Sequence, residues 1–88
     1  MPNLSNLIPN LSNALQGPTE QWRQDHDDDA FLANVEAIAN PILVEAGLSE
    51  LDSGAIVQCD TRASGAAGYR TELASNLIEA SMLNGVWP

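Results

Sequence analysis

Hydrophobic residues recur at helical spacing in the first fifteen positions of the chain. Residues 2–8 are followed directly by residues 9–15, and both heptads begin with the phrase Pro-Asn-Leu-Ser-Asn. Apolar positions at i, i+3, i+4 and i+7 predict one apolar stripe along a helix. The stripe comprises Leu4, Leu7, Ile8, Leu11, Ala14 and Leu15. Because the opposite face carries Asn and Ser instead of charges, we expect this arm to dock onto a protein surface. The alternative is the first helix of a bundle formed by the same chain.

Prolines are expected to divide this N-terminal region. Pro9 lacks the N–H of a helix interior, so a helix beginning near Pro9 after a looser segment is predicted. Gly17 and Pro18 are expected to end that helix. Residues 19–24 then predict a short helical turn anchored by Trp22.

The apolar pattern in the middle of the chain predicts two further helices. Aspartates precede an apolar stripe in residues 28–40, which is typical of a helix N-terminus. Because the residue before a proline disfavours helical geometry, the Asn40-Pro41 step predicts a boundary or a kink. A second short helix is expected after it, with Gly47 as its C-terminal cap.

The last third of the chain predicts one extended segment and one helix. Alternating residues near 55–60 favour a short strand, which would place Ala55, Val57 and Cys59 on one face. Residues 70–84 have the period of a helix. The predicted fold class is therefore mainly α, a small domain of three to four helices with one short extended segment near 55–60 and an amphipathic N-terminal arm.

Charge is confined to the centre of the sequence. Twelve acidic residues face three arginines and no lysine, which gives a formal net charge of -9. Residues 1–19 and 80–88 carry no charged side chain. We therefore expect an uncharged arm at 1–19 and a single small acidic helical domain at 20–88 with an apolar C-terminal tail. A surface of this sign repels phosphates, so direct nucleic-acid binding is not expected.

Features of export are missing from the sequence. The N-terminus lacks the basic region of a signal peptide, and no apolar run is long enough to span a membrane. The single cysteine, Cys59, precludes an internal disulfide. These features predict a cytoplasmic protein or a component of a virus particle.

The spacing of acids after residue 24 resembles that of an EF-hand calcium loop. Asp25, Asp27, Asp29, Leu32 and Glu36 fall on positions 1, 3, 5, 8 and 12 of a twelve-residue loop. Position 6 should be glycine, however, and the alanine found there would cost roughly 1 kcal/mol or more. The alternative interpretation is an acidic helix N-terminus, and no metal or other cofactor is expected.

Other residues that could carry chemistry are isolated in the sequence. His26 has no second histidine or cysteine near it, which favours a solvated cluster over a metal site. Cys59 lacks a neighbouring base, so a buried structural thiol is expected. Residues 65–68 lack the Lys and Ser/Thr of a phosphate loop and predict a linker. Trp22 is expected in the core, whereas Trp87 is equally compatible with an interface and with a cap over the core.

No pairing of nucleophile and base emerges, so an enzyme is not expected. The favoured hypothesis is a structural or adaptor protein that docks through its neutral apolar ends onto other protein subunits, for example as a minor component of a virus particle. The predicted docking residues are Leu4, Leu7, Ile8, Leu11, Leu15, Val86 and Trp87. One alternative is an acidic nucleic-acid mimic that inhibits a DNA- or RNA-binding enzyme. A lesser alternative is a calcium-binding module.

Overall fold

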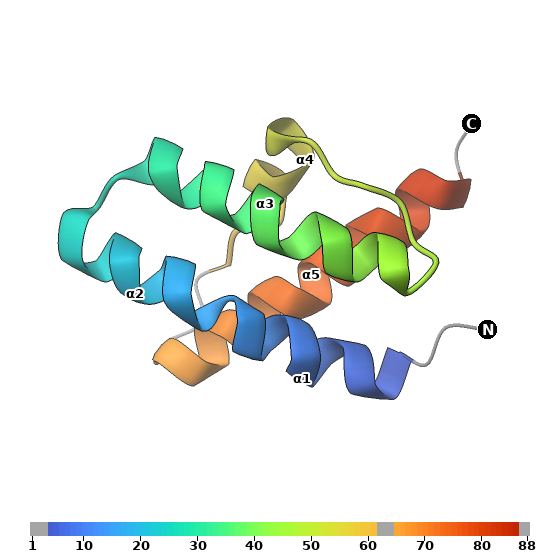
Figure 1. The fold of residues 1–88 in the computed structure, drawn as a ribbon, viewed down its shortest axis with the longest axis horizontal. Helices are drawn as coiled ribbons and strands as arrows, with labels where there is room; N and C mark the ends of the chain where they lie inside the picture. The colour runs from blue at the N-terminus through green and yellow to red at the C-terminus, as the bar shows by residue number, and fades with distance from the viewer. Residues whose placement is uncertain (1–3, 62–64, 87–88) are drawn as a thin grey trace.

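The computed structural model describes residues 4–61 and 65–86 of the chain, and within these ranges every regular element is an α-helix. The predicted mainly α class is therefore confirmed. The helices are α1 (Leu4–Ala14), α2 (Gln16–Asp25), α3 (Asp28–Glu45), α4 (Ser53–Gln58) and α5 (Ala66–Val86). Figure 1 shows α3 returning alongside α2 and α1, with α5 crossing behind them and the short α4 above.

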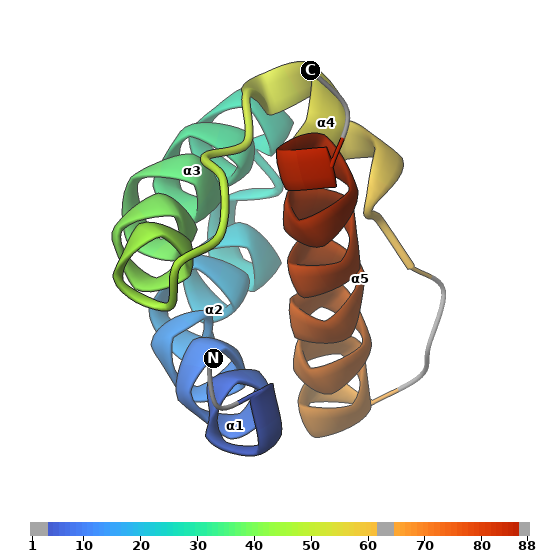
Figure 2. The same cartoon turned by 90° about the vertical axis from the view of Figure 1, so that its right-hand side faces the viewer.

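The first helix includes both heptads and is longer than predicted. It begins at Leu4 and continues through Pro9, which lies on its exposed side. The expected looser segment before Pro9 is therefore helical from residue 4 onward. Figure 2 shows α1 beside α5, and the stripe residues Leu7, Leu11 and Leu15 are at most 5% exposed.

Gly17 and Pro18 begin a helix instead of ending one. The chain continues in helical geometry through Leu15, whose carbonyl accepts the Thr19 N–H at 3.1 Å and the Thr19 hydroxyl at 2.7 Å. Pro18 lies in the first turn of α2, where backbone N–H groups have no partner within the helix. Its missing N–H therefore costs no hydrogen bond, which explains why the predicted stop fails.

Side-chain and backbone caps form the turn between α2 and α3. His26 adopts left-handed geometry with φ 52° and donates its N–H to the Trp22 carbonyl at 2.7 Å. The Asp27 carboxylate accepts the Ala30 N–H at 3.1 Å and begins α3. The acidic run therefore caps a helix, as one of the two sequence interpretations expected.

Helix α3 continues through Pro41, so the predicted alternative of a boundary there, with a second short helix after it, is wrong. Pro41 removes only the bond to the Ala37 carbonyl, and both residues are exposed, so water can replace the missing donor. The helix ends instead at Glu45, and Gly47 follows it with a φ of +86°, which suits glycine. Leu48 N–H bonds Leu43 O at 2.9 Å and Gly47 N–H bonds Val44 O at 2.9 Å. This pair of bonds is a Schellman motif and confirms Gly47 as the cap.

The predicted extended segment near 55–60 is wrong, because Ser53–Gln58 forms α4. The Asp52 carboxylate accepts the Ala55 N–H at 2.8 Å, so the turn-forming residues act as a helix cap. Burial follows the helix period: Ile56 and Cys59 are 3% and 4% exposed, whereas Val57 is 48% exposed. A strand would have placed Val57 and Cys59 on one face.

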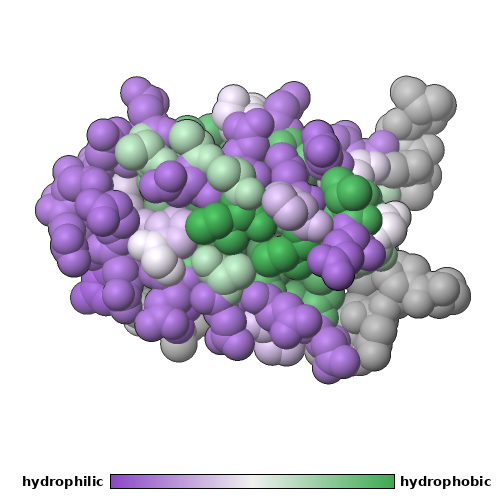
Figure 3. All heavy atoms as spheres, in the orientation of Figure 1, coloured by the Kyte–Doolittle hydropathy of each residue, from purple (hydrophilic) through white to green (hydrophobic). Residues whose placement is uncertain are grey.

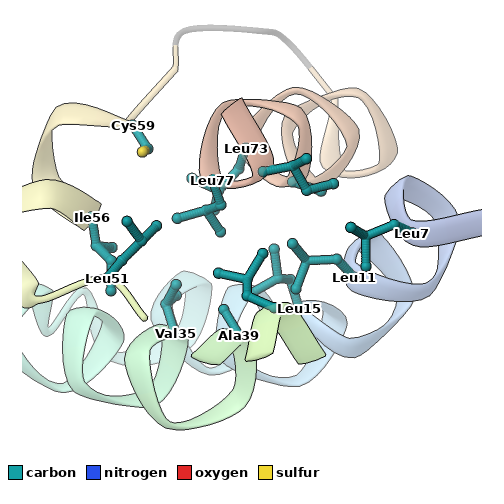
Figure 4. Packing of buried hydrophobic residues seen from close by; sticks show 13 residues of the cluster. Leu7, Leu11, Leu15, Val35, Ala39, Leu51, Ile56, Cys59, Leu73 and Leu77 are labelled. Atoms are coloured by element: carbon teal, nitrogen blue, oxygen red, sulfur yellow. The ribbon is translucent and has the colours of Figure 1, made fainter. Parts of the chain in front are cut away.

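A single core joins the helices. Helix α5 contacts α1, α2 and α3, and α4 packs on α3. Figure 4 shows leucines from α1 and α5 directed toward Val35 and Ala39 of α3. The buried hydrophobic residues are Leu7, Leu11, Leu15, Val35, Ala39, Leu43, Leu51, Ile56, Cys59, Leu73, Ala74, Leu77 and Ile78. The arm predicted at 1–19 thus shares its core with the domain predicted at 20–88, and the boundary between them falls inside α2.

Candidate binding pocket

An apolar pocket lies where α2, α3, α4 and the first turns of α5 meet. Its volume is about 350 Å³ and it is partly open to solvent. Buried Ile56 and Leu73 form part of its wall, and the half-exposed Val57 lies at its edge. The residues that line it are Trp22, Asp28, Phe31, Leu32, Ile56, Val57, Asp60, Thr61, Tyr69 and Leu73.

Aromatic side chains are concentrated in this pocket. The whole chain has two tryptophans, one tyrosine and one phenylalanine, and Trp22, Phe31 and Tyr69 all line it. They come from α2, α3 and α5. The rings of Trp22 and Phe31 are tilted by 54° with centroids 6.2 Å apart. Each ring is half-buried, so its remaining surface is available to a ligand.

Two exposed carboxylates line the same pocket, and each is held by an aromatic donor. The Trp22 indole N–H donates to Asp28 Oδ1 at 2.8 Å. The Tyr69 hydroxyl donates to Asp60 Oδ1 at 2.9 Å. Both donors are neutral, so the hydrogen bonds orient the carboxylates and leave their charge in place. The result is an apolar pocket with two fixed negative charges.

The α2–α3 turn sets the position of Trp22 and Asp28. Asp25 accepts the Asp27 N–H at 2.9 Å and the Gln21 side-chain amide at 3.0 Å. Both hydrogen bonds lower the pKa of Asp25, and the one from the Asp27 N–H has the larger effect. The charged turn lies at one end of the molecule, where Figure 3 shows a hydrophilic surface.

The hydrogen bond of Tyr69 to Asp60 gives a testable titration. Burial, this hydrogen bond and the negative charge of Asp60 raise the pKa of Tyr69 well above its ordinary value of 10.0. The folded state therefore favours the protonated hydroxyl. Its contribution to stability is complete below about pH 10 and is lost as the pH rises through the folded-state pKa.

We expect the single tyrosine to remain protonated above pH 10.0 in the folded protein. Tyrosinate absorbance during alkaline titration measures this directly. In Asp60→Asn the transition should move down toward that of the urea-unfolded chain. A wild-type transition coinciding with that of the unfolded chain would contradict the hydrogen bond.

The structure places most of the predicted docking stripe inside the protein. Leu7, Leu11 and Leu15 are 5%, 0% and 0% exposed, and Ile8 is partly buried against the same core. These side chains are covered by the chain itself, so their assignment to an exposed docking face is corrected. The alternative, the first helix of a bundle, describes their packing. Leu4 and Val86 belong to helices by their backbone, but their side chains and all of Trp87 lie outside the described residues.

The spacing that resembles a calcium loop is accounted for by helix capping. α3 begins at Asp28, so Asp29, Leu32 and Glu36 lie along a helix instead of around a loop. Asp27 uses Oδ1 to cap that helix. Within residues 4–61 and 65–86, no three His, Cys, Asp or Glu side chains are grouped to hold a metal ion.

The other candidate residues of the sequence are His26, Cys59 and Trp22, and each contacts neighbouring side chains or backbone. His26 is exposed and contacts the Trp22 ring edge-on with centroids 5.3 Å apart. Burial raises the pKa of the Cys59 thiol, with a further contribution from the charge of Glu79. Cys59 is 4% exposed and its Sγ lies 3.3 Å from the Ala55 carbonyl, which agrees with the expected buried thiol. Trp22 is half-buried in the pocket wall and is not a core residue.

Sequence reasoning did not identify this pocket. Asp28 and Asp60 are 32 positions apart, and the pocket depends on α4, which the sequence pattern had predicted as a strand. One signal was present: Trp22 and Phe31 stand on either side of the acidic turn, so a helical hairpin brings them together. No such sequence signal places Tyr69 near Trp22 and Phe31.

Comparisons with known proteins found no relative of this chain. Searches of protein-family models, of curated proteins and of solved structures each found no match to this chain. Across the described helices, none combines the length and apolar character needed to cross a membrane.

Proposed function

We propose that this chain is a non-enzymatic adaptor or structural subunit that binds another protein through the aromatic pocket between α2, α3, α4 and α5. The observation that carries the proposal is the convergence of Trp22, Phe31 and Tyr69 in one open apolar pocket. Aromatic residues are enriched at the energetic centres of protein interfaces. An acidic subunit of a larger assembly, such as a virus particle, is one setting in which such a pocket would be occupied.

A second apolar surface supports an adaptor role. A groove between α4 and α5 is lined in part by Leu51, Ala55, Ala80 and Leu83, and it shares no lining residue with the aromatic pocket. Leu83 is 51% exposed and the adjacent Met82 is 42% exposed. Met82 and Leu83 belong to the neutral C-terminal segment, residues 80–88, that the sequence predicted to dock. Two separate surfaces would allow one copy to contact two neighbours.

The proposal is tested by blocking the pocket without disturbing the core. Val57 lines the pocket and is 48% exposed, so Val57→Arg fills the opening at little expected cost in stability. Val44 is 49% exposed and lies outside the pocket, so Val44→Arg is a matched control with the same change of charge. Tagged versions are expressed in the native source, and co-purifying proteins are quantified after cross-linking.

We expect a specific protein to be retained by wild type and by Val44→Arg, and its recovery to fall about tenfold or more with Val57→Arg. Circular dichroism confirms that both variants keep the wild-type helix content. Equal recovery with all three versions would overturn the pocket as the docking site.

A further inference from the structure

We propose that the group bound in the aromatic pocket is an arginine side chain, presented by a basic segment of the protein partner. This inference rests on the proposed function and adds the chemistry of the occupant. The inference is based on one observation: the aromatic rings and two carboxylates line the same pocket. The rings are those of Trp22, Phe31 and Tyr69, and the carboxylates are those of Asp28 and Asp60.

The carboxylates argue against a purely hydrocarbon occupant. An apolar group that covered Asp28 and Asp60 would remove water from two charges without replacing its hydrogen bonds, which is unfavourable. The Trp22 indole and the Tyr69 hydroxyl, which donate to Oδ1 of Asp28 and of Asp60, are neutral and therefore do not balance the negative charge of these carboxylates. A cation bound in the pocket that both carboxylates line is attracted by each of them.

The aromatic rings select the form of the cation. Arginine combines an apolar stem with a planar guanidinium that stacks on aromatic faces and donates several hydrogen bonds to carboxylates, whereas lysine offers a compact, strongly hydrated charge. The stem matches the wall made by Ile56 and Leu73. The guanidinium matches the rings and the carboxylates.

Size and charge of the protein agree with a basic partner segment. The pocket volume of about 350 Å³ falls at the lower end of the range of ligand sites, roughly 300–1,000 Å³, which suits one long side chain and a neighbouring apolar group. The formal net charge of -9 attracts a basic segment over the whole surface and accelerates its association.

Paired peptides provide the test. The probe is the capped peptide acetyl-Ala-Leu-Arg-Leu-Ala-amide, and its control replaces arginine with citrulline, which keeps the shape but lacks the charge and carries a carbonyl oxygen in place of one NH2 group. Binding is followed by NMR at the Trp22 indole N–H. The Trp87→Phe variant removes the only other indole signal.

We expect the arginine peptide to bind about tenfold or more tightly than the citrulline peptide, with the difference decreasing as salt is added. Asp28→Asn with Asp60→Asn should remove most of this preference. Asparagine retains a carbonyl oxygen to accept from the Trp22 and Tyr69 donors. Glu72→Gln removes an exposed acid elsewhere on α5 and should leave the preference unchanged.

The outcomes separate the two proposals. If both peptides bind equally and Val57→Arg abolishes both, the pocket is an apolar docking site and the arginine inference is overturned. If neither peptide binds while Val57→Arg still releases the native partner, the arginine inference alone is overturned. If neither peptide binds and Val57→Arg releases nothing, both proposals are overturned.

Discussion

Leu11→Asp is expected to unfold the entire protein. Leu11 is 0% exposed and belongs to the core formed by α1, α3 and α5. Even Leu11→Ala should lower the free energy of unfolding by about 2–5 kcal/mol, through lost apolar contact and the cavity left behind. An aspartate at this position also buries an unpaired charge. Because a domain of this size is stabilised by only roughly 5–15 kcal/mol, little folded population should remain.

Far-UV circular dichroism and urea unfolding measure this effect. Asn13→Asp introduces the same charge at an exposed position of the same helix and should retain the wild-type helix content. Leu15→Asp, at a second position with 0% exposure, should behave like Leu11→Asp. A protein that kept α3 to α5 folded with either leucine replaced would show that α1 is a separable docking arm and not part of the core.

The apolar period of the opening heptads predicted a helix but not the surface that it contacts. A stripe that docks onto a partner and a stripe that packs within its own chain have the same sequence signature. The absence of charge on the outer face favoured docking, yet Asn6, Asn10 and Asn13 are simply exposed to solvent. The contact between α1 and α5 joins the two ends of the chain, and no local pattern specifies such a contact.

Prolines and glycines end fewer helices than the sequence pattern predicted. Pro18 falls in a first turn where no donor is needed, and Pro41 falls on an exposed face where the carbonyl that loses its donor is accessible to water. Gly47 was predicted correctly, because a left-handed φ is a strong local preference of glycine. Local chemistry therefore predicted both ends of α3, whereas the effect of each proline depended on its position in the helix and on its exposure.

The turn-forming residues before α4 favoured a strand where the structure has a helix. The sequence from Asp52 to Gly54 suits both a turn before a strand and the cap of a helix. Helical geometry buries Ile56 and Cys59 together against the rest of the core. It also brings Ile56 and Val57 to the pocket, so the wrong element concealed part of the candidate site.

Asn40→Ala is expected to produce the second large loss of stability. The Asn40 side chain donates to the Leu51 carbonyl at 2.8 Å and accepts the Leu51 N–H at 2.8 Å. It thereby fastens the segment between α3 and α4 to α3, and Leu51 itself is only 2% exposed. Alanine leaves a buried donor and a buried acceptor without partners, at about 1–3 kcal/mol each. We expect the free energy of unfolding to fall by about 2–4 kcal/mol in urea titrations.

Asn34→Ala is the matched control, because Asn34 is exposed on the same helix and should change stability by less than about 0.5 kcal/mol. Asn40→Asp separates the two bonds: its carboxylate still accepts the Leu51 N–H but repels the Leu51 carbonyl. Protonation converts that carboxylate to a donor, which raises its pKa in the folded state, so the stability of Asn40→Asp relative to wild type should recover as the pH falls toward about 4 and be fully regained below it. Amide exchange at Leu51 provides a local readout, since its N–H should stay protected in Asn40→Asp and exchange rapidly in Asn40→Ala. Equal protection in both variants would mean that core packing alone holds the segment before α4.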